Sequence, residues 1–132
     1  MNPPVQTRIR LDSVQVTKID FCSTTFEKEI TSDTYLSLEK SLFKNQEDEH
    51  RFRIAFLVTL LIDSKEFELE LKAVAHFFSL EPVTEEFLKS DFAQINAPAI
   101  SFPFLRAYIA NFTVNSGFNP IMLPAFIITS EN

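Results

Sequence analysis

The chain has 132 residues, which is the usual size of one domain, and we expect residues 1–132 to form a single domain. Hydrophobic residues make up 45% of the chain and charged residues 23%, a balance that excludes wholesale disorder. The formal net charge of -6 repels nucleic acid and anionic lipid, so neither is expected as a partner. The single glycine excludes glycine-rich phosphate-binding loops.

Residue types that build metal and redox sites are scarce. The lone Cys22 has no partner for an intramolecular disulfide, and the separated His50 and His76 do not complete a metal-ligand pattern with it. We therefore expect no metal and no cofactor. Residues 1–12 lack the apolar core of a secretory signal, and the uncharged stretch 107–130 contains too many Asn and Pro residues for a membrane span. A cytoplasmic location without membrane insertion is expected.

Alternating hydrophobicity predicts four strands. They are residues 8–22, 34–43, 51–63 and 66–77. The third has apolar residues at every second position from Phe52 to Ile62, and the middle of its other face is also apolar, which predicts a central strand. A polar turn at 63–66 predicts an antiparallel hairpin of the third and fourth strands. A change of parity at Asp12 and Ser13 predicts a bulge in the first strand.

Two helices are predicted after the strands. A short one begins near Val83, where Thr84 can cap its first turn. A longer one begins between Pro98 and Pro103 and ends at Gly117. The elements together predict an α+β fold, in which a four-stranded antiparallel sheet carries the long helix and the short connecting helix on one face.

The last third of the chain is almost free of charge. After Asp91, only Arg106 and Glu131 carry ionisable side chains. Such a segment is covered either by its own domain or by another subunit. The row Phe104, Tyr108 and Phe112 has helical spacing, which is typical of a core face and, because apolar residues widen it, also of an oligomer interface. Apolar residues on the irregular segments around this helix could line a groove for apolar segments of other polypeptides: Phe102, Phe118, Ile121, Met122, Leu123 and Phe126.

Catalysis has weak support in the sequence. No nucleophile motif is present, and His76 in a strand pattern is interpreted as structural. An enzyme would need a deep polar pocket around His76 and the strand acids. Those acids, Glu66, Glu68 and Glu70, alternate on one strand face, which predicts either mere exposure or a docking stripe for a basic partner.

Residues 96–106 read NAPAISFPFLR, and residues 119–124 read NPIMLP. This pattern resembles the signature region of the SecB family of export chaperones, in which an A/C-P-x-I-x-F-P-Y/F-x-R run leads to a P-x-x-L-x-P segment. The resemblance implies a four-stranded sheet with helices on one face, assembled as a dimer of dimers in which the long helices meet. It further implies an ATP-independent holdase, not an enzyme, that binds unfolded polypeptides or preproteins and in some members passes them to the SecA motor.

The resemblance also implies roles for individual residues. The client-binding groove is expected at Phe102, Leu105, Ile109, Phe118, Ile121, Leu123 and Phe126. The oligomer interface is expected at Phe104, Tyr108 and Phe112. The acidic docking site for a partner such as SecA is expected at Asp20, Glu68 and Glu70. Family members usually continue into a second helix and an acidic tail, whereas this chain ends at Asn132. Holdase activity is therefore better supported than export, and an adaptor dedicated to one partner, such as a toxin–antitoxin chaperone, is the alternative.

Overall fold

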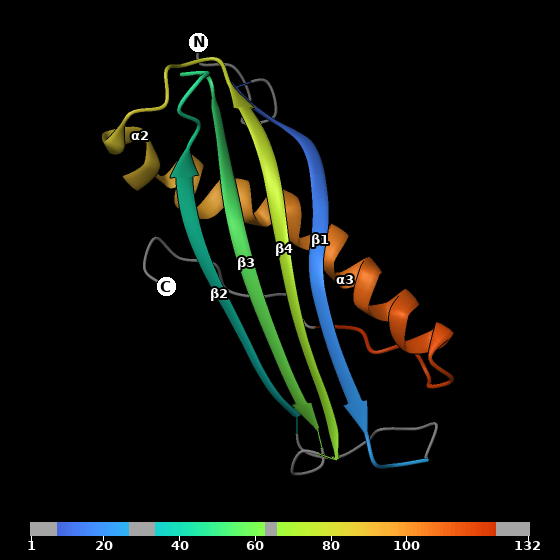
Figure 1. Cartoon of the computed structure of the whole chain (residues 1–132). Helices are drawn as coiled ribbons and strands as arrows, with labels where there is room; N and C mark the ends of the chain where they lie inside the picture. The colour runs from blue at the N-terminus through green and yellow to red at the C-terminus, as the bar shows by residue number, and fades with distance from the viewer. Residues whose placement is uncertain (1–7, 27–33, 63–65, 124–132) are drawn as a thin grey trace.

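The computed structural model describes residues 8–26, 34–62 and 66–123. Four strands form one antiparallel sheet in the order β1-β4-β3-β2 (Figure 1). They are β1 (Ile9–Ser23), β2 (Thr34–Lys44), β3 (Arg51–Ile62) and β4 (Phe67–Ser79). The predicted fold class and the β3–β4 hairpin are confirmed, and β3 is a central strand as predicted. Predicted strand limits agree with these bounds within two residues.

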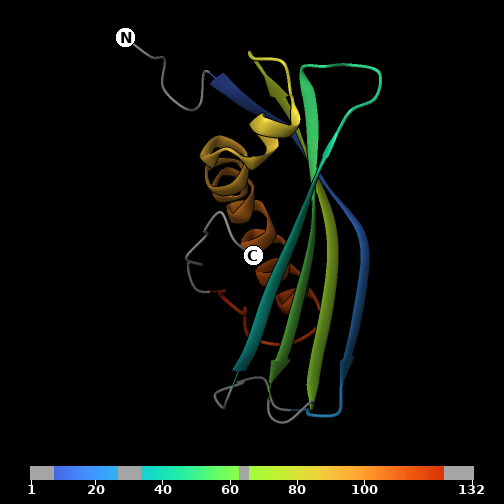
Figure 2. The same ribbon diagram turned by 90° about the vertical axis from the view of Figure 1, so that its left-hand side faces the viewer.

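The helices of the described residues all lie against one face of the sheet (Figure 2). They are α2 (Glu85–Lys89), the π-helix η1 (Phe92–Asn96) and α3 (Ala97–Asn115). The hydroxyl of Thr84 accepts a hydrogen bond from the backbone N–H of Phe87 at 3.0 Å, so the predicted cap of α2 is confirmed. We call the two sides of the sheet the helix face and the outer face.

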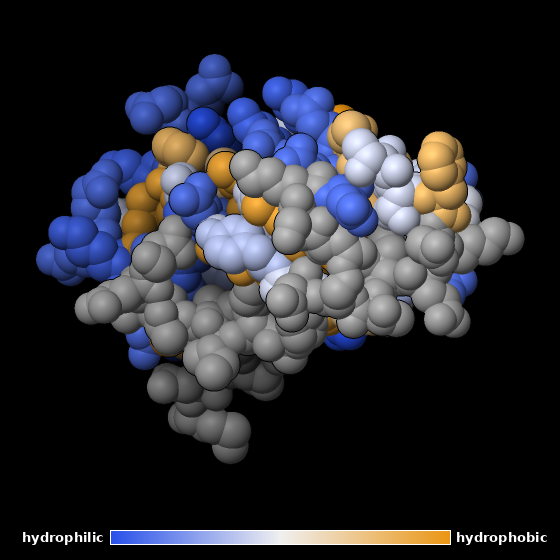
Figure 3. Space-filling model, turned by 90° about the horizontal axis from the view of Figure 1, so that it is seen from below, coloured by the Kyte–Doolittle hydropathy of each residue, from blue (hydrophilic) through white to orange (hydrophobic). Residues whose placement is uncertain are grey.

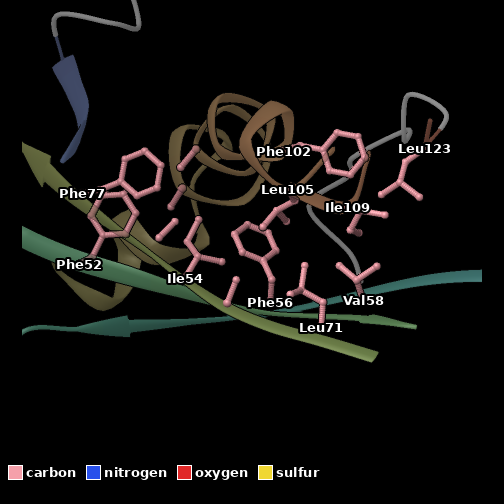
Figure 4. Close-up of a cluster of buried hydrophobic side chains, with 14 of the residues drawn as sticks. Phe52, Ile54, Phe56, Val58, Leu71, Phe77, Phe102, Leu105, Ile109 and Leu123 are labelled. Carbon is pink, nitrogen blue, oxygen red and sulfur yellow. The ribbon is translucent and has the colours of Figure 1, made fainter. Parts of the chain in front are cut away.

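The hydrophobic core lies between the sheet and α3 (Figure 4). Strand side chains alternate between the two faces, so the even-numbered positions of β3 and the odd-numbered positions of β4 all point into it. From α3 the core receives Phe102, Leu105 and Ile109. Burying each such side chain stabilises the fold by about 1.5–3 kcal/mol. The contact of these side chains with the sheet therefore fixes the position of α3.

Strand β1 is irregular at two points. Its register against β4 shifts between Leu11 and Ser13, as predicted, and again between Val16 and Lys18, which was not predicted. At the first bulge the carboxylate of Asp12 lies on the sheet surface, where Arg10 Nε donates to it at 3.0 Å and Arg51 forms an ion pair with it. The ion pair between Asp12 at this bulge and Arg51 therefore links β1 to β3 across the intervening strand β4.

The Asp12 cluster predicts a pH-dependent contribution to stability. Burial alone would raise the pKa of Asp12, but hydrogen bonds and charges from Arg10 and Arg51 outweigh it and hold that pKa below its usual value. A lowered folded-state pKa stabilises the fold above the unfolded pKa, and this contribution is lost as the pH falls through the folded value. Asp12→Asn should thus be slightly less stable than the wild type at pH 7, with the difference disappearing in acid. Urea denaturation at pH 7 and at about pH 2, below the usual Asp pKa, checks this, and a difference that persists at the acidic pH would contradict it.

The start of α3 differs from the prediction. The helix begins at Ala97 rather than between Pro98 and Pro103, and η1 precedes it directly. Pro98 has no N–H to donate to the carbonyl of Gln94 four residues earlier, and Lys40 Nζ donates to that carbonyl instead, at 2.5 Å. Burial lowers the pKa of Lys40. This bond ties the start of the helix layer to the β2 edge of the sheet.

Candidate functional site

One flank of helix α3, beside its core-facing side, is aromatic. Phe104, Tyr108 and Phe112 follow one another at four-residue spacing along one flank. The rings of Tyr108 and Phe112 stack with centroids 6.4 Å apart, and Phe112 meets Phe21 edge-on at 5.3 Å. Because Phe21 belongs to β1, this flank lies on the β1 side of the molecule. We call these three residues the aromatic row.

The chain turns sharply where α3 ends. Gly117 has a φ of 95°, a conformation that favours glycine, and the N–H groups of Gly117 and Phe118 donate to the carbonyls of Val114 and Thr113. The predicted stop at Gly117 is therefore confirmed as a Schellman motif. The hydroxyl of Thr113 then accepts a hydrogen bond from the N–H of Ile121 at 3.0 Å, which holds the segment 118–123 against the helix.

The predicted groove residues divide into a buried and an accessible group. Phe102 is 6% exposed, and Leu105, Ile109 and Leu123 are fully buried in the core beneath α3 (Figure 4). Phe118 and Ile121 are partly buried and reach the surface, and Phe118 also contacts Phe21 and Phe67 edge-on. Phe126 lies outside the described residues. A partner can therefore touch this layer directly through the segment after α3, while the buried group supports it from below.

Large apolar side chains are exposed on the same layer. Phe104 is 55%, Val114 49% and Met122 62% exposed. Viewed from below, hydrophobic side chains reach the surface between hydrophilic ones (Figure 3). We call the accessible apolar side chains of α3 and the segment after it the helix surface. Its members are Ile100, Phe104, Tyr108, Phe112, Val114, Phe118, Ile121 and Met122.

Arg106 is the only charged residue of α3. Its side chain is partly buried, and its Nε atom is buried without a hydrogen-bond partner among the described residues. The sequence identified Arg106 only as a rare charge in an uncharged segment. Burial and the missing acceptor are properties of the packed helix that spacing does not reveal.

The outer face carries the predicted docking acids. Asp20 of β1 lies directly opposite Glu70 of β4, and Glu68 follows two residues along the same face. The three side chains line one open pocket of about 440 Å³, together with residues of β1, β3 and β4. Lys18 Nζ forms an ion pair with Asp20 at 3.2 Å and neutralises part of the charge. The structure thus brings together all three acids that the sequence assigned to one site.

The opposite end of the outer face is basic and aromatic. The guanidinium carbons of Arg10 and Arg51 lie 4.9 and 5.7 Å from the centre of the Phe78 ring, and Arg53 lies 4.8 Å from that of Phe43. Sequence reasoning missed this cluster, because its residues come from four different strands. The adjacent-strand pairing that assembles it follows only from the register.

In the described part of the chain, His76 and the acids of β4 line different pockets. His76 Nε2 lies 2.8 Å from the side-chain oxygen of Gln15, which fits the predicted structural role. His76 lines a pocket of about 110 Å³, whereas Glu68 and Glu70 line a different one. Within the described ranges, no group of three metal-ligating side chains comes together. None of the described helices combines the length and hydropathy that a membrane span requires.

Comparison with known proteins gives one consistent family. The family model described as preprotein translocase subunit SecB matches residues 12–126. A protein-export protein SecB of Anaplasma marginale, strain Florida, is 46% identical over 46 residues, and that of strain St. Maries matches equally. The aligned part is 35% of this chain and spans only 26% of each relative's length.

Solved structures agree on the fold. A SecB-like chaperone of Mycobacterium tuberculosis, in complex with a ChAD peptide from the HigA1 antitoxin, has a TM-score of 0.72 at 15% identity, covering 92% of this chain and 90% of the other. A protein of unknown function from Streptococcus agalactiae has a TM-score of 0.54 at 14% identity, covering 89% and 97%. With a family model that matches most of its length, the chain belongs to the SecB family.

Proposed function

We propose that the protein is an ATP-independent holdase that binds apolar segments of non-native polypeptides on its helix surface. The observation that carries this proposal is the exposure of the apolar side chains of Val114 and Met122 on the helix layer, where Phe118 and Ile121 also reach the surface. Apolar side chains that gather at the surface mark interaction sites in folded proteins. Family membership supports a chaperone role for that surface. A cytoplasmic location, where such clients emerge, is part of the proposal.

Binding in this scheme makes and breaks no covalent bond. An extended client segment transfers apolar side chains from water onto the helix surface, and each 100 Å² of apolar area removed contributes about 2.5 kcal/mol. Met122 adds a flexible, polarizable side chain that can adapt to clients of different shape. The buried residues Leu105 and Ile109 act by holding α3 in place beneath the contact.

Self-assembly is the second use of the helix layer. We propose that the aromatic row meets the same row of another subunit, in a dimer of dimers. Phe104 is the most exposed member of the row, so it gains most from burial in such a contact. The segment after α3, with Phe118, Ile121 and Met122, stays available for clients.

The holdase proposal is tested by aggregation assays with two unrelated unfolded proteins. At a few-fold molar excess and without nucleotide, the purified protein should suppress light scattering from both substrates, and its mass should be that of an oligomer in the same buffer. An oligomer that suppresses neither substrate would contradict a general holdase.

An adaptor dedicated to one partner is the alternative. It is favoured by the structural similarity to a chaperone that was solved with an antitoxin peptide. Client breadth separates the two functions: a general holdase acts on both substrates of the assay, whereas an adaptor fails on both and binds one specific peptide tightly.

The outer-face acids form the proposed docking site for a basic partner, for which SecA is the candidate that family membership suggests. Asp20, Glu68 and Glu70 attract a cationic surface, and this attraction is sensitive to salt. Glu70→Lys should weaken SecA binding by about tenfold or more while leaving aggregation suppression unchanged. Binding measured by calorimetry checks this, with Glu39→Lys on the same face as the control. Equal losses from both variants would contradict a local docking site.

A further inference from the structure

We propose that Arg106 is a specificity-determining residue of the helix surface, where its guanidinium donates hydrogen bonds to the main-chain carbonyls of a bound client segment. This inference rests on the proposed holdase function. Nε of Arg106 is the one side-chain polar atom in the described part of the chain that is both buried and without a hydrogen-bond partner. Folded proteins pair almost all such atoms, so an unpaired one calls for a functional explanation.

The neighbouring positions of α3 supply no side-chain acceptor for Arg106. Its neighbours on the helix, three and four residues away, are Phe102, Pro103, Ile109 and Ala110. None of them carries a side-chain oxygen, and α3 has no other charged residue. Partial removal of a positively charged guanidinium from water without an acceptor is unfavourable. Because Nε itself is covered in the free protein, the flexible Arg106 side chain must turn outward to pair with an oxygen that a partner brings to the surface.

The position of Arg106 indicates which partner that is. Thr113 lies seven residues further along, on the same side of the helix and about 10 Å away along its axis. Its hydroxyl holds the N–H of Ile121, so the accessible segment after α3 crosses this side of the helix. The aromatic row lies roughly 160° around the axis from Arg106. Arg106 thus borders the proposed client surface and points away from the proposed subunit contact.

The chemistry of the client indicates which atom it offers. A segment that binds through apolar side chains brings no side-chain acceptor, so its main-chain carbonyls are the oxygens available. Every polypeptide has these carbonyls, and a hydrogen bond to them adds affinity without demanding a particular sequence. The helix surface selects apolar side chains, and Arg106 selects an extended main chain whose carbonyls are not already used in a helix or sheet.

The test uses a fluorescently labelled, end-blocked apolar peptide without Asp or Glu, and measures its affinity by anisotropy. Arg106→Met keeps length and apolar contact but removes all donors, and should weaken binding by about 5- to 30-fold. Arg53→Met removes an outer-face arginine and serves as the matched control, with affinity unchanged. Replacing single peptide amides by esters weakens the carbonyl acceptor. At the peptide position whose carbonyl Arg106 contacts, the ester should weaken binding to the wild type. The same ester should leave binding to Arg106→Met unchanged.

The outcomes separate this inference from the holdase proposal. Wild-type protein that binds no peptide and suppresses no aggregation overturns both. Wild-type binding that Arg106→Met leaves unchanged overturns only the role of Arg106. If Arg106→Met changes the oligomer mass, the hydrogen-bond acceptor for Arg106 lies on a second copy of the chain. That result also overturns the proposed role of Arg106 in client binding. If Arg106→Met fails to fold, the ester series on the wild type alone decides: equal affinity for every ester peptide overturns the inference.

Discussion

Phe67→Ala should lower the free energy of unfolding by about 3–5 kcal/mol, the range for deleting a fully buried phenylalanine ring. The Phe67 side chain is 0% exposed. Its ring meets Phe21 of β1 at 4.9 Å and Phe118 after α3 at 5.5 Å, both edge-on. Deletion therefore leaves a cavity where β4, β1 and the helix layer meet. Urea denaturation at pH 7 measures the loss.

Phe43→Ala is the matched control for this prediction. Phe43 is 42% exposed on the outer face, where its ring contacts Arg53, so the same deletion leaves no enclosed cavity. It should cost about 1 kcal/mol or less. Equal losses for the two variants would show that the helix face does not contain the stabilising core.

Phe104→Glu should dissociate the oligomer into smaller species that remain folded. The ring is largely exposed on α3, so the isolated subunit tolerates a carboxylate there in contact with water. In the proposed subunit contact the same carboxylate would be buried against an apolar surface without a partner, which costs several kcal/mol. Light scattering coupled to size-exclusion chromatography gives the mass, and circular dichroism the fold.

Phe43→Glu places the same charge on an exposed phenylalanine of the outer face. Its mass should equal that of the wild type. If Phe104→Glu also keeps the wild-type mass, the aromatic row is not the subunit contact, and its exposed ring belongs to the client surface instead.

The strands were predictable because each signal is local. The two-residue spacing of β3 depends only on consecutive residues, and β3 and β4 pair through a short turn. The bulge at Asp12 was visible because the apolar residues change parity there. The second bulge, between Val16 and Lys18, also coincides with a change of parity, from Val14 and Val16 to Ile19 and Phe21, but this signal was not used in the prediction.

The start of α3 was mispredicted for a physical reason. Two prolines in a helical pattern each remove a backbone donor, which predicts a break. The chain instead continues through both: Pro98 lies in the first turn of α3, where a proline is tolerated, and Lys40 of a distant strand binds the carbonyl of Gln94. Pro103 and Ala99, its would-be acceptor, lie on the exposed side of the helix. Contacts between elements far apart in sequence are not visible in local spacing.

For the candidate site too, features set by local spacing were predictable, and features set by packing between distant residues were not. The resemblance grouped Asp20 with Glu68 and Glu70 but did not give the register that places Asp20 opposite Glu70. Helical spacing correctly grouped the aromatic row on one flank. The unpaired Nε of Arg106 depends on the packing of residues around it, and periodicity carries no information about acceptors. Hydrophobicity alone likewise did not separate buried Leu105 from accessible Phe118, because both are apolar.

Amide hydrogen exchange of the protein, alone and with an unfolded client bound, tests the central claim most directly. Client binding to the helix surface should slow exchange in α3 and in residues 118–123, and leave the outer-face strand ends near Asp20 and Glu70 unchanged. Slowed exchange confined to the outer face, or no change anywhere with a client that demonstrably remains bound, would contradict the assignment of client binding to the helix layer.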